Sequence, residues 1–392
     1  MRAILTLLAI CGSLWADGWA LVGLLDGTGA LSGDGKAHLR SLQESWGGPG
    51  AIGLVTGSTV GDKRTLTRWT RDDEAAPWCL AGQGGVSAAE WLSDYLAWGS
   101  AQTGDRNLII VVMGHGLPPC SGGGGQATPG KLLRGCVPEG ITGPEMARGM
   151  AVVDDRGARR QKVLVLEACY SASLELLWDL RGSVDAVVCA PGAISSPGLP
   201  WAQMLAGARG WLPEDGAGVA GALVERIPGD RGALSACDLS SLSQVHDSLR
   251  ALSRFGLADM ASAAAGAQSA TAQAAAGQTL RQVCDAGELA GMFAACARTG
   301  ELKAAAGQFE RALEKLVIRR TCAGESSAQM RDRGAAGVTL HLPPALVKRA
   351  GPYVMASRLA RSTGYEAFVQ GYLEYCAGLV PGLGFAPPAD RG

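Results

Sequence analysis

Apolar residues along this chain gather into short continuous runs that alternate with segments of helical periodicity. The runs are rich in Val, Ile and Leu and are bounded by Gly or polar residues, which is typical of strands buried on both faces of a parallel sheet. They predict strands over residues 19–25, 51–55, 108–113, 163–166, 186–190 and 337–342. The periodic segments between the early strands predict helices over residues 36–46, 87–98, 144–150 and 171–180. This alternation predicts an α/β fold with a right-handed, mostly parallel sheet that is covered by helices on both faces.

The second half of the chain has a more helical pattern. From about residue 214 the periodicity predicts helices over residues 239–255, 289–296, 307–316 and 364–376, and the Ala-rich stretch up to residue 279 is either helix or a mobile low-complexity segment. Alternation over residues 65–70 is typical of a short edge hairpin. We therefore expect a core over residues 17–213, a helical region with a late strand over 214–376, and a frayed tail over 377–392.

Two of the predicted strands end directly in reactive side chains. The strand over 108–113 is followed by Gly114-His115-Gly116, and the strand over 163–166 is followed by Glu167-Ala168-Cys169. Ligands of parallel sheets bind at the carboxyl ends of the strands. The pattern therefore predicts that His115 and Cys169 meet at one edge of the sheet.

The chain has four histidines, so each was weighed as a partner for a nucleophile. His38 and His246 lie in predicted helices and are interpreted as ordinary helix surface, whereas His341 alternates within a strand, where packing is the default interpretation. His115 differs because glycines flank it at a strand end and leave room for a substrate. His115 is therefore the candidate general acid and base.

Cys169 is the candidate nucleophile. The alternative is that it merely packs, because free cysteine is among the most buried residue types. Small and polar residues follow it and open the helix predicted over 171–180, so we expect the positive end of the helix dipole to favour its thiolate. Backbone N–H groups of Gly116 and Cys169 are candidates for an oxyanion hole.

Composition bounds the class of protein. The 392 residues include 35 Lys and Arg and 36 Asp and Glu, so the net charge is close to zero. A chain with this balance has no overall positive potential to attract nucleic acid or an anionic membrane. Arg2, the apolar run over 3–10 and Leu14-Trp15-Ala16 predict a secretory signal over residues 1–16, although the same run is also compatible with a first buried strand. No later apolar run reaches the roughly 20 residues of a membrane span. A secreted or periplasmic protein acting on a small molecule or a protein is the expectation.

The chain has 11 cysteines, which is compatible with some disulfides in an oxidising compartment. No CxxC pair occurs, so a zinc site of the usual spacing has little support, and no metal site is expected. Cys120 and Cys136, which flank a Gly-rich loop, are the pair favoured for a bridge. If the signal is removed and Cys169 stays free, at least one other thiol is left unpaired.

A strand ending in His-Gly and a second ending in an acid, Ala and Cys resemble the double signature of caspase-like cysteine peptidases. The separation of His115 and Cys169 is close to the roughly 50 residues typical of caspases. Within that clan the chain resembles the clostripain family most closely. Further segments that resemble the family follow in the same order: residues 167–173, 191–201, 233–239, 337–343 and 362–372.

The resemblance implies an α/β/α caspase-like core and cleavage of peptide bonds after Arg or Lys. It places Glu167 at the base of the S1 pocket, with Ala190 and Trp201 as further S1 positions. Two departures qualify this: Glu167 has one methylene more than the acid of the family, and Ala190-Pro191 stands where the family often has Ser-Glu. In addition, Pro200 replaces a glycine of the family's loop before Trp201. Calcium is the one ion that the resemblance suggests, but the Gly-rich neighbourhood of Asp26 and Asp34 lacks EF-hand spacing.

The resemblance also implies maturation by self-cleavage between His115 and Cys169. The long loop over 117–140 offers Lys131 and Arg134 as cut sites, with later candidates at Arg156, Arg159, Arg160 and Lys162. The alternative is a disulfide-pinned glycine insertion that is not processed. Two further alternatives stay open for the whole protein: a peptidase-like module that binds peptides without cutting them, and the Asn or Asp specificity of legumain, which Glu-Ala-Cys also resembles.

Overall fold

The structure of the 392-residue chain is a computed structural model. It describes residues 18–28, 31–48, 50–57, 64–70, 74–79, 88–116, 140–151, 160–194, 197–228, 233–277, 283–321, 335–343 and 357–379. The predicted signal over residues 1–16 and most of the predicted tail lie outside these ranges. Helix α15 extends to Leu379, so the first residues assigned to the tail are helical.

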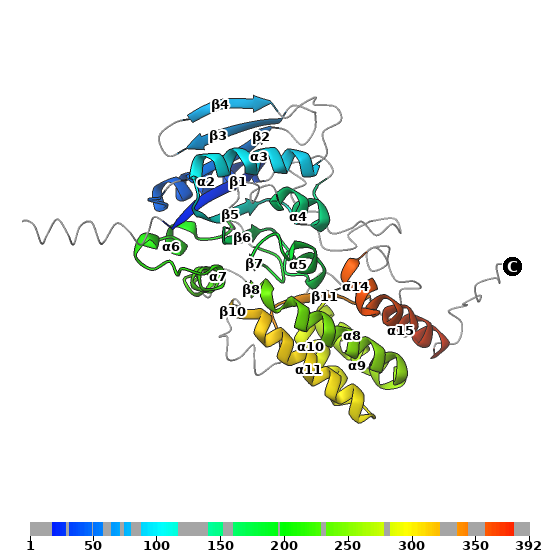
Figure 1. Cartoon of the computed structure of the whole chain (residues 1–392). Helices are drawn as coiled ribbons and strands as arrows, with labels where there is room; N and C mark the ends of the chain where they lie inside the picture. Colours follow the sequence, from blue (N-terminus) through cyan, green and yellow to red (C-terminus); the bar gives the residue numbers. More distant parts are fainter. Residues whose placement is uncertain are drawn as a thin grey trace, which may run out of the picture.

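A nine-stranded sheet forms the centre of the molecule (Figure 1), with the strand order β10-β8-β7-β6-β5-β1-β2-β3-β4. The five central strands β2, β1, β5, β6 and β7 run parallel, and the outer strands pair antiparallel. The strands are β1 (Trp19–Thr28), β2 (Gly50–Gly57), β3 (Arg64–Thr70), β4 (Glu74–Cys79), β5 (Asn107–Met113), β6 (Lys162–Glu167), β7 (Ala186–Cys189), β8 (Leu234–Asp238) and β10 (Val317–Thr321). The parallel centre explains why its strands read as continuous apolar runs.

Side chains of the central strands alternate between two hydrophobic clusters, one on each face of the sheet. In β1, Leu21 and Leu25 join one cluster, and Val22 and Leu24 join the other. Helices α2 (Ser32–Ser45), α6 (Trp201–Met204) and α7 (Gly216–Glu225) cover the first face. Helices α3 (Ala88–Thr103), α4 (Gly143–Ala151) and α5 (Leu174–Leu180) cover the second. The predicted three-layer α/β/α arrangement is confirmed.

The C-terminal region packs beyond α5 on the second face and extends the same hydrophobic cluster (Figure 1). Its helices are α8 (Leu242–Ala258), α9 (Met260–Gly277), α10 (Ala286–Cys296), α11 (Gly300–Leu316), α14 (Arg358–Thr363) and α15 (Tyr365–Leu379). The short strands β9 (Val283–Asp285) and β11 (Thr339–His341) pair antiparallel in a second sheet. The Ala-rich segment, for which helix and mobile chain were both open, is helix α9.

Side-chain caps fix where several of these helices begin. Asp215 caps α7, Asp285 caps α10 and Thr299 caps α11, each by accepting a hydrogen bond from a backbone N–H of the first turn. Asp285 also accepts hydrogen bonds from the backbone N–H groups of Ala336 and Gly337, at 2.7 Å each. One half-buried carboxylate therefore joins the start of α10 to the segment that leads into β11.

Candidate active site

His115 and Cys169 lie just beyond the carboxyl ends of two neighbouring strands. Strands β5 and β6 pair in parallel with Met113 opposite Glu167, and each reactive residue follows its partner of that pair by two positions. The backbone N–H of Gly114 donates to the Glu167 carbonyl oxygen at 3.2 Å and continues the pairing past the strand ends. His115 is exposed and Cys169 is half-buried. The parallel register therefore places both side chains at the same edge of the sheet.

Gly116 packs directly against the backbone of Cys169. A Cβ atom added at Gly116 would overlap the carbonyl oxygen of Cys169 and lie 2.9 Å from its backbone nitrogen. Only a residue without a side chain fits this approach. The two residues predicted to supply oxyanion-hole N–H groups are therefore neighbours in space.

The loop that follows β7 closes around Cys169. The backbone N–H of Ile194 donates to the Cys169 sulfur at 3.4 Å, and that of Tyr170 donates to the Gly192 carbonyl oxygen at 2.8 Å. Tyr170 has a φ of 56°, a left-handed conformation that is uncommon for a side chain of this size. The turn after β6 thus holds the thiol against the 190–194 segment instead of continuing into a helix.

The prediction that Cys169 lies at a helix N-terminus is wrong. Helix α5 begins only at Leu174, and its N-cap is Ser173, whose side chain accepts a hydrogen bond from the N–H of Leu176. The intervening residues form the turn around Tyr170, because Ser171 is held by Ala190, whose N–H donates to the Ser171 hydroxyl at 3.0 Å. Because the dipole acts over the first turn of a helix, α5 does not activate this thiol.

The structure brings two of the three predicted S1 residues together, but buries all three. Glu167 accepts hydrogen bonds from the N–H of Leu199 at 2.7 Å and from Trp201 Nε1 at 2.8 Å, so both carboxyl oxygens bind the 197–201 loop. Glu167 is 5% exposed, Trp201 is 1% exposed and Ala190 is fully buried. Gly198 makes this contact sterically feasible, because its φ is 89° and an added Cβ would overlap Glu167 Oε1. Their role in S1 stays a prediction, and the structure adds that Glu167 anchors this loop.

Burial raises the pKa of the Glu167 carboxyl to about 8, although the hydrogen bonds from Leu199 and Trp201 lower it. The pKa of Glu167 is thus higher in the folded chain than in the unfolded chain, where it is about 4.5. The stabilisation that results is fully present below pH 4.5 and is lost as the pH rises to about 8. Burial therefore favours the protonated form of the Glu167 carboxyl.

Replacing Glu167 by Gln is expected to remove this pH dependence. Relative to the Glu167→Gln variant, the wild-type free energy of unfolding should fall by on the order of a few kcal/mol as the pH rises from about 4.5 to about 8. Urea denaturation at several pH values measures this difference. The matched change Glu301→Gln, at an exposed position in the first turn of α11, should not reproduce it. If the free energy of unfolding changed with pH in the same way for wild type and Glu167→Gln, the raised pKa of Glu167 would be contradicted.

His38 is buried, which corrects its interpretation as helix surface. It is 4% exposed, and its Nδ1 lies 3.1 Å from the Met113 sulfur and 3.3 Å from Glu167 Oε1. A sequence signal existed: Gly35, His38 and Leu42 are the buried residues of α2 and have helical spacing. His341 is fully buried, as expected. His246 is only partly exposed and stacks on Trp178 at 4.7 Å between ring centroids.

Several predicted features lie outside the described residues. They include the candidate cut sites Lys131, Arg134, Arg156 and Arg159 and the favoured disulfide pair Cys120 and Cys136. Six described cysteines have free thiols: Cys169, Cys189, Cys237, Cys284, Cys296 and Cys376. Among the described residues, no group of three or more His, Cys, Asp or Glu side chains is arranged to hold a metal ion. Within the same part of the chain, no helix is both long and apolar enough to cross a membrane.

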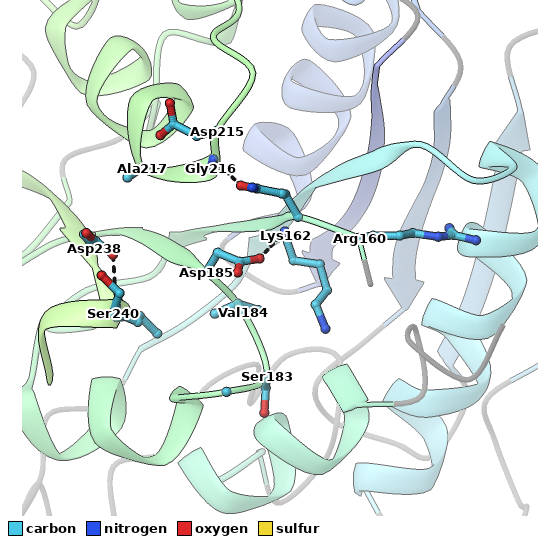
Figure 2. A pocket seen from close by; sticks show the side chains of 13 residues that line it. Arg160, Lys162, Ser183, Val184, Asp185, Asp215, Gly216, Ala217, Asp238 and Ser240 are labelled. Atoms are coloured by element: carbon cyan, nitrogen blue, oxygen red, sulfur yellow. Dashed lines mark hydrogen bonds between the residues drawn. The ribbon is translucent and has the colours of Figure 1, made fainter. Parts of the chain in front are cut away.

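A pocket of about 270 Å³ lies where β6 and β7 begin (Figure 2). His115 and Cys169 follow the other ends of β5 and β6, so the pocket is at the opposite edge of the sheet from them. Arg160 and Lys162, the remaining candidate cut sites, contribute to its lining and are each 3% exposed. Arg160 donates to Ser100 Oγ at 3.0 Å and lies 3.5 Å from Asp105 Oδ1. Cleavage after Arg160 or Lys162 would therefore require this region to open.

A half-buried thiol and an exposed imidazole lie just beyond adjacent carboxyl ends of a parallel sheet, a placement compatible with a cysteine hydrolase. Residues 144–346 match the model of the clostripain family, which is more than half of the chain. The chain belongs to this family and is a cysteine peptidase. The matched region contains Cys169, whereas His115 precedes it. Among curated proteins, none matches this chain significantly.

Solved structures support the same fold. A secreted C11 cysteine protease from Bacteroides thetaiotaomicron, in complex with an irreversible peptide inhibitor, is 15% identical with a TM-score of 0.58, covering 89% of this chain and 99% of its own. An inactive zymogen C11 protease from Parabacteroides distasonis is 14% identical with a TM-score of 0.55, covering 91% and 96%. At such identities the likeness establishes the caspase-like fold alone.

Proposed function

We propose that this protein is a cysteine endopeptidase in which Cys169 is the nucleophile and His115 is the general acid and base. The observation that carries the proposal is the β5–β6 register, which pairs Met113 with Glu167 and so brings the two following segments to one edge of the sheet. The close packing of Gly116 on Cys169 supports it independently. Both segments directly follow buried central strands, and regular elements of this kind position a site more precisely than loops do.

The chemistry follows from these groups. The Cys169 thiolate attacks the scissile carbonyl carbon, and the negative charge develops on the carbonyl oxygen, which the N–H groups of Gly116 and Cys169 would stabilise. His115 gives a proton to the leaving amine, and the peptide bond breaks to leave a thioester. Water then attacks the thioester with His115 as base, which releases the carboxylic acid and restores the thiol. No step requires a metal ion, and calcium remains a suggestion of the family resemblance.

For substrate specificity we propose cleavage after Arg or Lys, on the family resemblance and on the position of Glu167 at the carboxyl end of β6, two residues before Cys169. A second specificity, for an uncharged P1 side chain, is favoured by the engagement of both Glu167 oxygens with the 197–201 loop. In that case the pocket would lack a free acid to pair with a basic side chain.

A library of fluorogenic peptides that varies only P1 tests the specificity. The proposal predicts that kcat/KM for Arg or Lys exceeds that for Ala, Asn or Asp by at least about tenfold, as expected for a charge recognised in a desolvated pocket. A preference for Ala or another uncharged residue would support the second specificity, and a preference for Asn or Asp the legumain-like one. If wild type cleaved no peptide of the library while Cys169→Ala still bound peptides, the protein would instead be a peptidase-like module that binds peptides without cutting them.

We further propose that the protein is secreted or periplasmic and matures by self-cleavage, with protein or peptide substrates as its partners. Two structural relatives are described as a secreted protease and as an inactive zymogen, which supports both ideas by analogy. Lys131 and Arg134 remain the preferred cut sites, because Arg160 and Lys162 are buried.

A further inference from the structure

One buried imidazole contacts the ends of both strands that carry the proposed catalytic pair. His38 lies on α2, and its Nδ1 is 3.1 Å from the sulfur of Met113, the last residue of β5. The same nitrogen is 3.3 Å from Oε1 of Glu167, the last residue of β6. Each contacted residue precedes a reactive residue, His115 or Cys169, by two positions.

The ring also reaches the loop that closes over Glu167. His38 hydrogen-bonds to the backbone of Pro197, which accepts through its carbonyl oxygen because proline has no N–H. An atom added at the Cβ position of Gly198 would approach His38 Cε1 to 2.6 Å, so ring and loop are closely packed. His38 thus touches three segments that meet at the site: the end of β5, the end of β6 and the 197–201 loop.

A neutral imidazole carries a single N–H, and the tautomer decides which ring nitrogen holds it. In the Nδ1–H tautomer the proton faces the Met113 sulfur, which has no hydrogen of its own to donate, and Glu167 Oε1. Burial lowers the pKa of the imidazole, while the Pro197 hydrogen bond and the charge of Asp34 on α2 raise it. Burial raises the pKa of Glu167, the acid that faces the ring from β6. Burial therefore favours the uncharged form of each partner, which is compatible with the buried position of the pair.

We propose that His38 is a positioning residue of the peptidase site, holding the His115 and Cys169 segments in register through Met113 and Glu167. This inference rests on the proposed roles of His115 and Cys169. The hydrogen bonds of His38 fix the two strand ends and the loop relative to each other, although the ring touches no reacting atom. His38 also gives Glu167 a partner inside the protein.

Two substitutions test the role. His38→Leu removes both ring nitrogens, and His38→Asn keeps an N–H donor near the place of Nδ1. We expect His38→Leu to lower kcat by about tenfold to a hundredfold at little-changed KM, since small misplacements of catalytic groups have effects of this size. His38→Asn should recover kcat to within about threefold of wild type, because it preserves the donor toward Glu167. His246→Leu, at a histidine on α8 far along the chain, should leave kcat unchanged.

A second measurement is independent of turnover: the rate at which iodoacetamide alkylates Cys169, followed by mass spectrometry. His38→Leu should change this rate by about tenfold and His38→Asn by much less. If His38→Leu lowered Tm but kept the wild-type kcat and alkylation rate, His38 would be a packing residue and the inference would be overturned. Equal defects in the Leu and Asn variants would overturn it as well. Absence of turnover in wild type would count against the proposed function, while the alkylation rates would still decide the role of His38.

Discussion

Replacing Cys169 by Ala is expected to lower kcat/KM on the best peptide of the P1 library by at least about a thousandfold. Loss of the nucleophile removes the covalent route, and only the residual effect of binding and oxyanion stabilisation remains. The sulfur is half-buried and accepts a hydrogen bond from the Ile194 N–H, so the smaller Ala side chain introduces no clash and removes only that acceptor. If the chain cleaves itself, the intact mass of Cys169→Ala should also remain that of the uncut protein.

The matched control is Cys296→Ala, which removes another half-buried free thiol at the end of α10, remote from the site. This variant should keep the wild-type kcat/KM and the wild-type pattern of processing. If peptidase activity survived in Cys169→Ala and disappeared in another cysteine variant, that other cysteine would be the nucleophile.

Replacing Gly116 by Ala is expected to lower kcat/KM by at least about a hundredfold, because a displacement of about 1 Å at catalytic groups has effects of this size. The added Cβ would overlap the carbonyl oxygen of Cys169, and no change of rotamer relieves a clash with backbone. The His115 and Cys169 segments must therefore separate. Overpacking of this kind is also expected to lower the free energy of unfolding by roughly 1–3 kcal/mol.

Gly291→Ala is the control for this substitution. Gly291 lies within α10, and a Cβ atom added there meets nothing within 4 Å. The control should keep full activity and gain roughly 0.5–1 kcal/mol of stability, because Ala favours the helix interior. Wild-type activity in Gly116→Ala would show that the two segments do not need this close contact.

The sequence was sufficient to predict the layers of the fold and the place of the reactive pair. Residues 108–113 of β5 and 163–166 of β6 are buried on both faces of the sheet and are all apolar, and the polar residues that follow mark the edge of the sheet. The parallel direction follows from the crossover between them, which contains helix α4. The prediction that His115 and Cys169 lie at one edge needed only these local signals.

What could not be predicted depends on contacts between distant segments. Strand β8 reads as mixed polar and apolar, because the hydroxyl of Ser235 is buried by donating to the carbonyl oxygen of Gly337, far along the chain. The turn at Tyr170 replaced the predicted helix start for a similar reason, since its N–H is held by Gly192. Glu167 accepts hydrogen bonds from Leu199 and Trp201, which both follow β7 in the chain. None of these pairings has a local pattern in the sequence.

The most direct measurement of the central claim is the site of covalent modification by an electrophilic peptide that ends in lysine. The purified, folded protein is incubated with the peptide under reducing conditions, digested and mapped by mass spectrometry. We predict one label per chain, on Cys169, with labelling abolished in Cys169→Ala and unchanged in Cys296→Ala. A label on another residue, or none on Cys169 of a protein that cleaves peptides, would contradict the assignment of Cys169 as the nucleophile.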